Sequence, residues 1–111
     1  MESILTSIKK MLGIESGYTH FDNDIILLIN GVFTTLNQIG VGPEQPVVIT
    51  GDLETWSGCF PNVASMESVK TYVYLKVRMI FDTSTVTSYV LDALNRQAQE
   101  LEWRLSVQAE T

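Results

Sequence analysis

Residues 68–86, SVKTYVYLKVRMIFDTSTV, limit the possible folds more than any other stretch of the chain. Read at alternate positions, the residues from Val69 to Phe81 place apolar side chains on one face, which is typical of a half-buried strand. A strand of that length needs partner strands of similar length, and the rest of the chain offers only VVIT at 47–50. A helix satisfies its own backbone donors and acceptors, whereas a lone strand does not. The sequence therefore predicts a helix over 66–81 and, with it, an all-α domain.

The helix predicted over 66–81 has the composition of the central helix of a bundle. Ser65 is its expected N-cap, and Glu67 places a carboxylate in the first turn. Apolar residues run nearly all the way round it, so we expect neighbouring helices on more than one side.

Three further helices are predicted from the periodic spacing of apolar residues, over about 3–12, 22–39 and 86–108. Gly13 and Gly40 follow the first two of these helices. Both are expected to end them, because glycine can take the left-handed conformation that often ends a helix. Together with 66–81 these segments predict a small four-helix bundle that occupies the whole chain, 1–111, as one domain.

The second predicted helix carries the strongest local signals. Asp22 is expected to be its N-cap, and Asp24 adds a favourable negative charge to the first turn. Phe21 and Ile26 have the spacing of a hydrophobic staple. Gly31 lies inside the helix and costs roughly 1 kcal/mol relative to alanine, so we expect it to mark a close helix crossing.

The last predicted helix has an apolar side and a polar side. Thr85 or Thr87 can cap it. Glu100 and Arg104 are four residues apart in the order that favours an ion pair. Trp103 lies among polar neighbours, off the apolar stripe, and is therefore a candidate partner contact. The stripe itself consists of Val90, Ala93, Leu94, Ala98, Leu101 and Leu105.

The segment 41–64 is predicted to be a long irregular loop between the second and third of these helices. Prolines and glycines are concentrated in it, which excludes a long regular element. VVIT at 47–50 is a possible short strand, and DLETW at 52–56 is a possible helical turn that anchors Trp56. Loops of this length are uncommon in compact domains and are often functional.

Composition narrows the class of protein. The chain has 111 residues, 45% of them apolar and 18% charged, which is ordinary for one globular domain. Its formal net charge of −6 disfavours sequence-independent nucleic-acid binding. A single cysteine excludes an intrachain disulfide and suits a reducing compartment. The longest strongly apolar run, 25–29, is too short to span a bilayer, and the N-terminal charges lie in the wrong order for a signal peptide. These features predict a soluble cytosolic domain.

The sequence offers little for catalysis. Cys59 and the single histidine, His20, are a conceivable nucleophile and base, but a small buried cysteine is the favoured interpretation. His20, Asp22 and Asp24 form an H-x-D-x-D run that suggests a metal as an alternative to capping. The sequence contains no phosphate-binding glycine loop and no metal-spaced cysteine set. We therefore expect no enzyme activity, no metal and no cofactor.

Four segments follow one another in an order that is informative as a whole. They are ESILTSIKKMLGI, DNDIILLINGVFTTLNQIGVGP, VKTYVYLKVRMIFDTST and ALNRQAQELEWRL. The most specific parts are NQIGVGP at the end of the second helix, VKTYVYLKVR followed by FD, and ELEWRL near the C-terminus. Over about residues 3–107 this order resembles a known family, the small head–tail connector proteins of tailed phages, which serve as head-completion or adaptor proteins.

The resemblance implies a mostly helical fold and a structural role in the virion. Such proteins assemble as a ring, typically dodecameric, beneath the portal protein of the capsid. The ring extends the DNA channel and presents a surface to the next stopper or tail protein. DNA passes through without sequence-specific binding, which suits an acidic chain because a basic lining would grip phosphates. The implied location is the head–tail interface of the virion, with the host cytoplasm as the site of assembly and no membrane involved.

Two surfaces are the candidates for contacts with the portal and with neighbouring subunits. One is the loop 41–64, and the other is the side of the last helix that carries Trp103. A different class of function stays open, in which the chain is a small acidic helical binding or regulatory module acting as a monomer or dimer on one protein partner. Ring assembly or co-purification with a portal separates the two. The candidate interface residues are Trp56, Phe60, Trp103, Arg104 and Val107.

Overall fold

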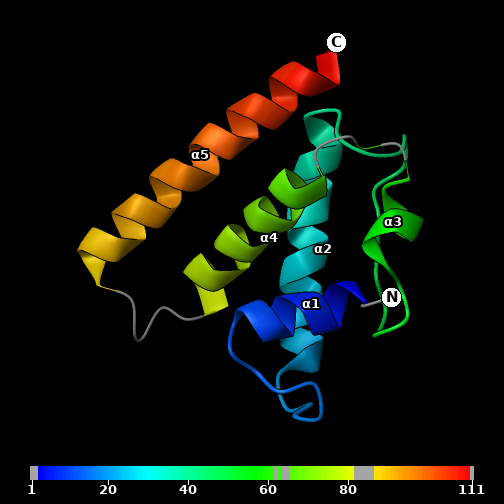
Figure 1. Cartoon of the computed structure of the whole chain (residues 1–111), viewed down its shortest axis with the longest axis vertical. Coiled ribbons are helices and arrows are strands. Elements are labelled where there is room, and N and C mark those ends of the chain that lie inside the picture. Colours follow the sequence, from blue (N-terminus) through cyan, green and yellow to red (C-terminus); the bar gives the residue numbers. More distant parts are fainter. Residues whose placement is uncertain (1–2, 62, 64–65, 82–86, 111) are drawn as a thin grey trace.

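Helices form all the regular structure in the described part of the computed structural model, which covers residues 3–61, 63, 66–81 and 87–110. Within those residues no sheet occurs, and Ser3 and Thr55 form an isolated antiparallel bridge. The predicted all-α fold with four-helix packing is confirmed, and a fifth helix of one turn is added to it (Figure 1). The helices are α1 (Ile4–Met11), α2 (Asp22–Gln38), α3 (Trp56–Cys59), α4 (Met66–Phe81) and α5 (Ser88–Glu110).

The predicted helix positions agree closely with the structure. The bounds of α4 are those predicted, and α1 and α2 differ from prediction by about one residue. α5 begins at Ser88 rather than at 86 and continues to Glu110. Of its two expected caps, Thr87 is confirmed, because its Oγ1 accepts a hydrogen bond from the N–H of Val90 at 3.2 Å. The other expected cap, Thr85, lies outside the described residues, as does Ser65 before α4.

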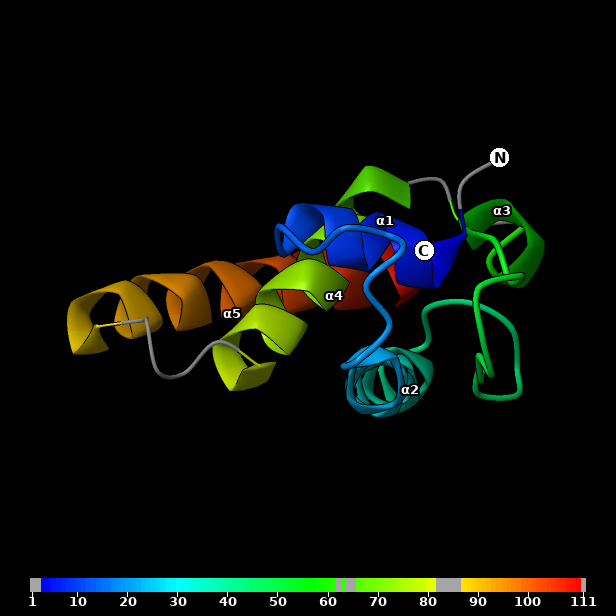
Figure 2. The same cartoon turned by 90° about the horizontal axis from the view of Figure 1, so that it is seen from below.

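α4 is the central helix, as predicted. It packs against α1, α2 and α5, so that it lies between α2 and α5 in the fold (Figure 1). α5 lies at the edge of the molecule, and its N-terminal half extends beyond the other helices (Figure 2). The buried residues of α4 are Val69, Tyr72, Val73, Leu75 and Val77.

Both ends of α1 are closed by local signals in the sequence. The hydroxyl of Ser3 accepts a hydrogen bond from the N–H of Thr6 at 3.1 Å and caps the start. At the other end Gly13 has a φ of 82°, which a residue with a Cβ rarely adopts. The N–H groups of Gly13 and Ile14 donate back to carbonyls in the last turn, at 3.1 and 2.8 Å. The predicted glycine cap of α1 is therefore confirmed, and Gly40 closes α2 with the same pattern of bonds.

The start of α2 differs from the prediction. The N-cap position is occupied by Phe21, and Asp22 is the first residue of the helix. Asp22 is instead engaged with α1, because its Oδ1 lies 2.7 Å from Nζ of Lys9. The predicted capping role of Asp22 is wrong for this reason. The predicted hydrophobic staple is wrong as well, because Phe21 is the N-cap itself and does not precede it. The Phe21 ring packs edge-on against Phe81, with 5.3 Å between centroids.

The Lys9 side chain is buried, with 3% of its surface exposed, and has three oxygen partners. Besides Asp22, its ammonium donates to the carbonyls of Ser16 and Tyr18, at 3.1 and 2.7 Å. These contacts join the last turn of α1, the connection that follows it and the first turn of α2. A buried ammonium is stable only when its donors are satisfied, and here the α1–α2 connection satisfies them.

The predicted short strand at 47–50 is wrong. The backbone of this segment bonds to a side chain and not to a second strand. The N–H of Ile49 donates to Oδ1 of Asn30 at 2.8 Å. Nδ2 of Asn30 donates back to the carbonyl of Ile49 at 3.0 Å. One amide on α2 thus satisfies both backbone groups of a buried residue. A second amide, that of Asn37, donates to the carbonyls of Pro43 and Glu44 and holds the start of the loop.

The helical turn in the loop also lies later than predicted. It occupies Trp56–Cys59 rather than 52–56, and Thr55 is its N-cap, with Oγ1 accepting from the N–H of Gly58 at 3.2 Å. The predicted anchoring of Trp56 is confirmed, because this side chain is only 5% exposed.

Gly31 does not mark a helix crossing, and that prediction is wrong. It is exposed on α2, and a Cβ built on it meets nothing within 4 Å.

We predict that Gly31→Ala raises the free energy of unfolding by about 1 kcal/mol, because alanine lowers the entropy of the unfolded chain without meeting a neighbour. Urea denaturation followed by circular dichroism measures the change. Gly13→Ala is the matched control and is expected to lower the stability, because its φ of 82° strains any residue with a Cβ. Equal changes in stability at the two positions would contradict the prediction that Gly31 tolerates a Cβ and Gly13 does not.

Candidate interaction surface

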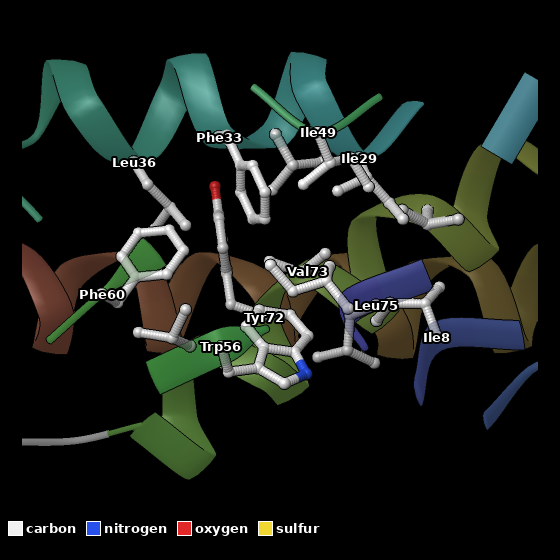
Figure 3. Packing of buried hydrophobic residues seen from close by; sticks show 14 of the residues in the cluster. Ile8, Ile29, Phe33, Leu36, Ile49, Trp56, Phe60, Tyr72, Val73 and Leu75 are labelled. Carbon is white, nitrogen blue, oxygen red and sulfur yellow. The ribbon is translucent and has the colours of Figure 1, made fainter. Parts of the chain in front are cut away.

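Trp56 and Phe60, two of the five candidate interface residues, lie in the core. Their exposed fractions are 5% and 1%. Both rings pack against Phe33 of α2, with centroid separations of 6.2 and 5.2 Å and near-perpendicular planes (Figure 3). Edge-to-face packing of this kind is favourable for aromatic rings. In this structure the two residues support the loop from inside, so any effect on an interface is indirect.

The loop held by these rings presents other apolar side chains to solvent. Val48 is exposed next to the buried Ile49, and Leu53 is exposed at the turn that precedes α3. That turn is fixed by Glu54, whose carboxylate accepts hydrogen bonds from the N–H and the hydroxyl of Thr50, at 2.8 and 3.1 Å. The backbone bond from Thr50 is the main reason why the pKa of Glu54 is lowered.

The other three candidate residues lie together on the outer side of α5. Trp103 is 67% exposed and Val107, one turn later, is 40% exposed. Arg104 is exposed as well, and its guanidinium pairs with Glu100 at 2.6 Å, which confirms the predicted ion pair. Tyr89 lies on the same side near the start of α5 and is 78% exposed. Sequence reasoning missed Tyr89, although its separation of 14 residues from Trp103, close to four helical turns, was visible in the sequence.

The inner side of α5 joins it to α4. The hydroxyl of Tyr72, on α4, donates to Oε2 of Glu102 at 2.9 Å. Burial, followed by this bond and the charge of Glu102, raises the pKa of Tyr72 above its ordinary value, so ionisation of the phenol requires a more alkaline pH than usual. The inner side of α5 is therefore buried against α4, whereas its outer side is exposed. The buried residues of the inner side are Leu94, Ala98 and Leu105.

The residues considered for catalysis or metal binding serve other contacts. His20 is exposed and packs edge-on against Phe21, with 4.7 Å between centroids. Cys59 is half-buried, and burial raises the pKa of its thiol, which disfavours the nucleophilic thiolate. Asp22 is paired with Lys9. In the ranges that the structure describes, no three His, Cys, Asp or Glu side chains are grouped so that they would hold a metal ion.

None of the helices in the described residues is both long enough and apolar enough to cross a membrane.

Comparison with protein-family models identifies the family of this chain. The model of a family described as phage connector protein matches residues 4–111, which is nearly the whole chain. A search of the curated proteins and a search of the solved structures each found no match. The family is structural rather than catalytic. The match extends from the first helical residue through α5 and so includes both candidate surfaces. The chain belongs to the phage connector protein family.

Proposed function

We propose that this protein is a head–tail adaptor that docks as a ring under the portal, extends the DNA channel and joins the capsid to the tail. The observation that carries the proposal is the family match over residues 4–111. The ring, with twelve subunits as its expected number, recruits the next stopper or tail protein on the side away from the portal. The protein acts in the virion after assembly in the host cytoplasm.

We assign the subunit and portal contacts to the outer side of α5 and to the loop 41–64. On α5 the contact residues are Trp103, Arg104 and Val107, because large exposed aromatic and arginine side chains supply much of the binding energy of protein interfaces. Trp56 and Phe60 act from inside by holding the loop in shape.

The charge of the protein supports a channel through which DNA slides. The net charge is −6, and at least three of the seven basic residues form ion pairs in the part of the chain that the structure describes. Lys9 is buried against Asp22, and Arg104 is paired with Glu100. Because acidic residues outnumber basic ones, we expect the channel not to hold phosphates, and DNA passes through it without sequence-specific binding.

Native mass spectrometry of the protein mixed with the portal from the same genome tests the proposal. The expected result is a stoichiometric complex that carries a ring of this protein, and Trp103→Ala is expected to weaken it at least tenfold. Leu27→Ala is the control, since Leu27 is 72% exposed and belongs to α2 rather than to α5 or the loop 41–64. A protein that stays unbound beside the portal would contradict the proposal and favour the small binding module.

A further inference from the structure

The outer side of α5 carries a second band of side chains, separate from the inner stripe that packs on α4. Each residue advances about 100° around a helix, so residues spaced alternately by four and three stay within a narrow band. One such band of α5 holds the exposed Tyr89, Trp103 and Val107 together with two charged residues of opposite sign. These five residues are exposed, and Ala93, the sixth, is half-buried. The band, called here the outer seam, consists of Tyr89, Ala93, Arg96, Glu100, Trp103 and Val107.

The outer seam lies opposite the buried side of the same helix. Ala98, at the middle of the inner stripe, is 2% exposed and faces α4. The seam is centred on the same height along the helix but points away from the body of the molecule. α5 lies at the edge of the fold, and no other described helix covers its outer side (Figure 2). A spacing of four and three is that of the contact positions in a coiled coil, so it fits a second helix.

The side chains along the seam fit an antiparallel partner. The spacing is symmetric about Ala98, so a second copy running in the opposite direction brings different residues to the same layer. Tyr89 then meets Val107 of the partner subunit. Ala93 meets Trp103 of the partner subunit, which places a small side chain beside the largest one.

The charges in the middle of the seam distinguish between the two orientations. In the antiparallel arrangement Arg96 meets Glu100 of the partner subunit, beside the ion pair that Glu100 forms with Arg104 of its own chain. Two-fold symmetry repeats this contact. In a parallel arrangement in register, Arg96 would meet the same arginine of the other chain and Glu100 the same glutamate. Like charges in one layer are repulsive, and polar residues at contact positions commonly set the orientation of paired helices.

We propose that two copies of this chain associate through the outer seam of α5 as an antiparallel two-fold dimer. The layers pair an aromatic with an aliphatic residue, a large with a small residue, and a positive with a negative charge. The seam is only about 27 Å long at 1.5 Å per residue, and two of its six positions are charged. We therefore expect a weak dimer that dissociates on dilution, in the class of small transient interfaces.

The dimer covers Trp103 and Val107, the residues that the proposed function assigns to contacts in the ring. If that function holds, the dimer and the ring exclude each other, and the dimer keeps these side chains covered until assembly. This consequence rests on the proposed function, whereas the dimer itself does not.

Sedimentation velocity of the whole protein, without portal, over a range from micromolar to millimolar concentration tests the dimer. The expected result is a reversible shift from monomer to dimer. Trp103→Ala is expected to weaken the dimer at least tenfold, because the residue is lost from two symmetric layers. Leu27→Ala removes an equally exposed apolar side chain from α2 and is expected to change nothing.

Charge reversal tests the pairing within the seam. Arg96→Glu places two carboxylates in each central layer and is expected to abolish the dimer in the measured range. Adding Glu100→Arg exchanges the two charges and is expected to restore it. Circular dichroism of both variants checks that α5 is still helical. A monomer at all concentrations, or a dimer that withstands Arg96→Glu, would overturn the proposal.

The orientation is measured by a spin label at Ser88→Cys in a Cys59→Ala background. In the antiparallel dimer the two labels are separated by about twenty residues of helix, or roughly 30 Å. A separation below about 20 Å would show parallel helices and reject the arrangement. Because these measurements omit the portal, their failure leaves the adaptor function standing, and failure to bind the portal leaves the dimer standing.

Discussion

Lys9→Met is expected to lower the free energy of unfolding by about 3–5 kcal/mol, the range observed when one member of a buried ion pair is removed. Methionine keeps the length of the side chain but leaves Asp22 without its partner. It also leaves the carbonyls of Ser16 and Tyr18 without the ammonium that bonds to them. Urea denaturation followed by circular dichroism measures the loss. Hydrogen exchange is expected to rise most in the connection between α1 and α2.

Two further variants make this result specific. Lys10→Met changes the neighbouring exposed lysine and is expected to cost less than about 1 kcal/mol. Lys9→Met combined with Asp22→Asn is expected to cost less than the sum of the single changes, because the unpaired charge is then absent. If Lys9→Met unfolds at the same urea concentration as Lys10→Met, the buried pair does not hold this part of the fold.

Phe60→Ala is expected to destabilise the protein by about 3–5 kcal/mol, since it removes a fully buried ring and leaves a cavity. The ring packs against Phe33 and Trp56, with centroids 5.2 and 6.5 Å away, so its loss loosens α3 and the loop from α2. Thermal and urea denaturation measure the effect. Exchange of the Ile49 amide reports whether the loop separates from Asn30.

The comparison that separates a core role from a surface role uses two controls. Phe60→Leu keeps most of the volume and is expected to cost about 1–2 kcal/mol. Leu53→Ala, at an 88% exposed position of the same loop, is expected to stay within about 0.5 kcal/mol of the unchanged protein. Should Phe60→Ala be as stable as Leu53→Ala, then Phe60 is not part of the core.

Most of the helical framework was predictable because it depends on local signals. The bounds of α4 follow from apolar residues around the whole helix and from the lack of a partner strand. The end of α1 follows from Gly13, whose conformation depends on the absence of a Cβ. The ion pair of Glu100 and Arg104 follows from helical spacing alone. Each of these features is decided by residues within a few positions of one another.

The predictions that failed depend on contacts between distant residues. Asp22 has the chemistry of an N-cap, but Lys9 of the preceding helix binds its carboxylate. The residues 47–50 have the composition of a strand, but Asn30 satisfies the backbone of Ile49. Neither partner is visible in a local pattern.

The candidate surface was predictable only where it lies on a helix. Trp103 lies on a helix whose polar neighbours indicate its exposure, and the structure places it at the surface. Trp56 and Phe60 lie in a loop, where no periodicity indicates which way a side chain points. Their burial depends on how the loop folds back on Phe33. Tyr89 was not predicted as a surface contact, although helical spacing places it on the same side of α5 as Trp103.

The position of α5 at the edge of the fold has a consequence for local unfolding. α5 contributes Leu94, Ala98 and Leu105 to the buried apolar residues, and the others among the described residues lie outside it. Segments with few buried apolar residues open at a lower free energy than the rest of a core, so α5 is expected to detach before α1, α2 and α4 separate. Its detachment breaks the bond between Tyr72 and Glu102 and exposes the side of α4 around Tyr72 to solvent. Amide hydrogen exchange in α5 is therefore expected to be faster than in α4.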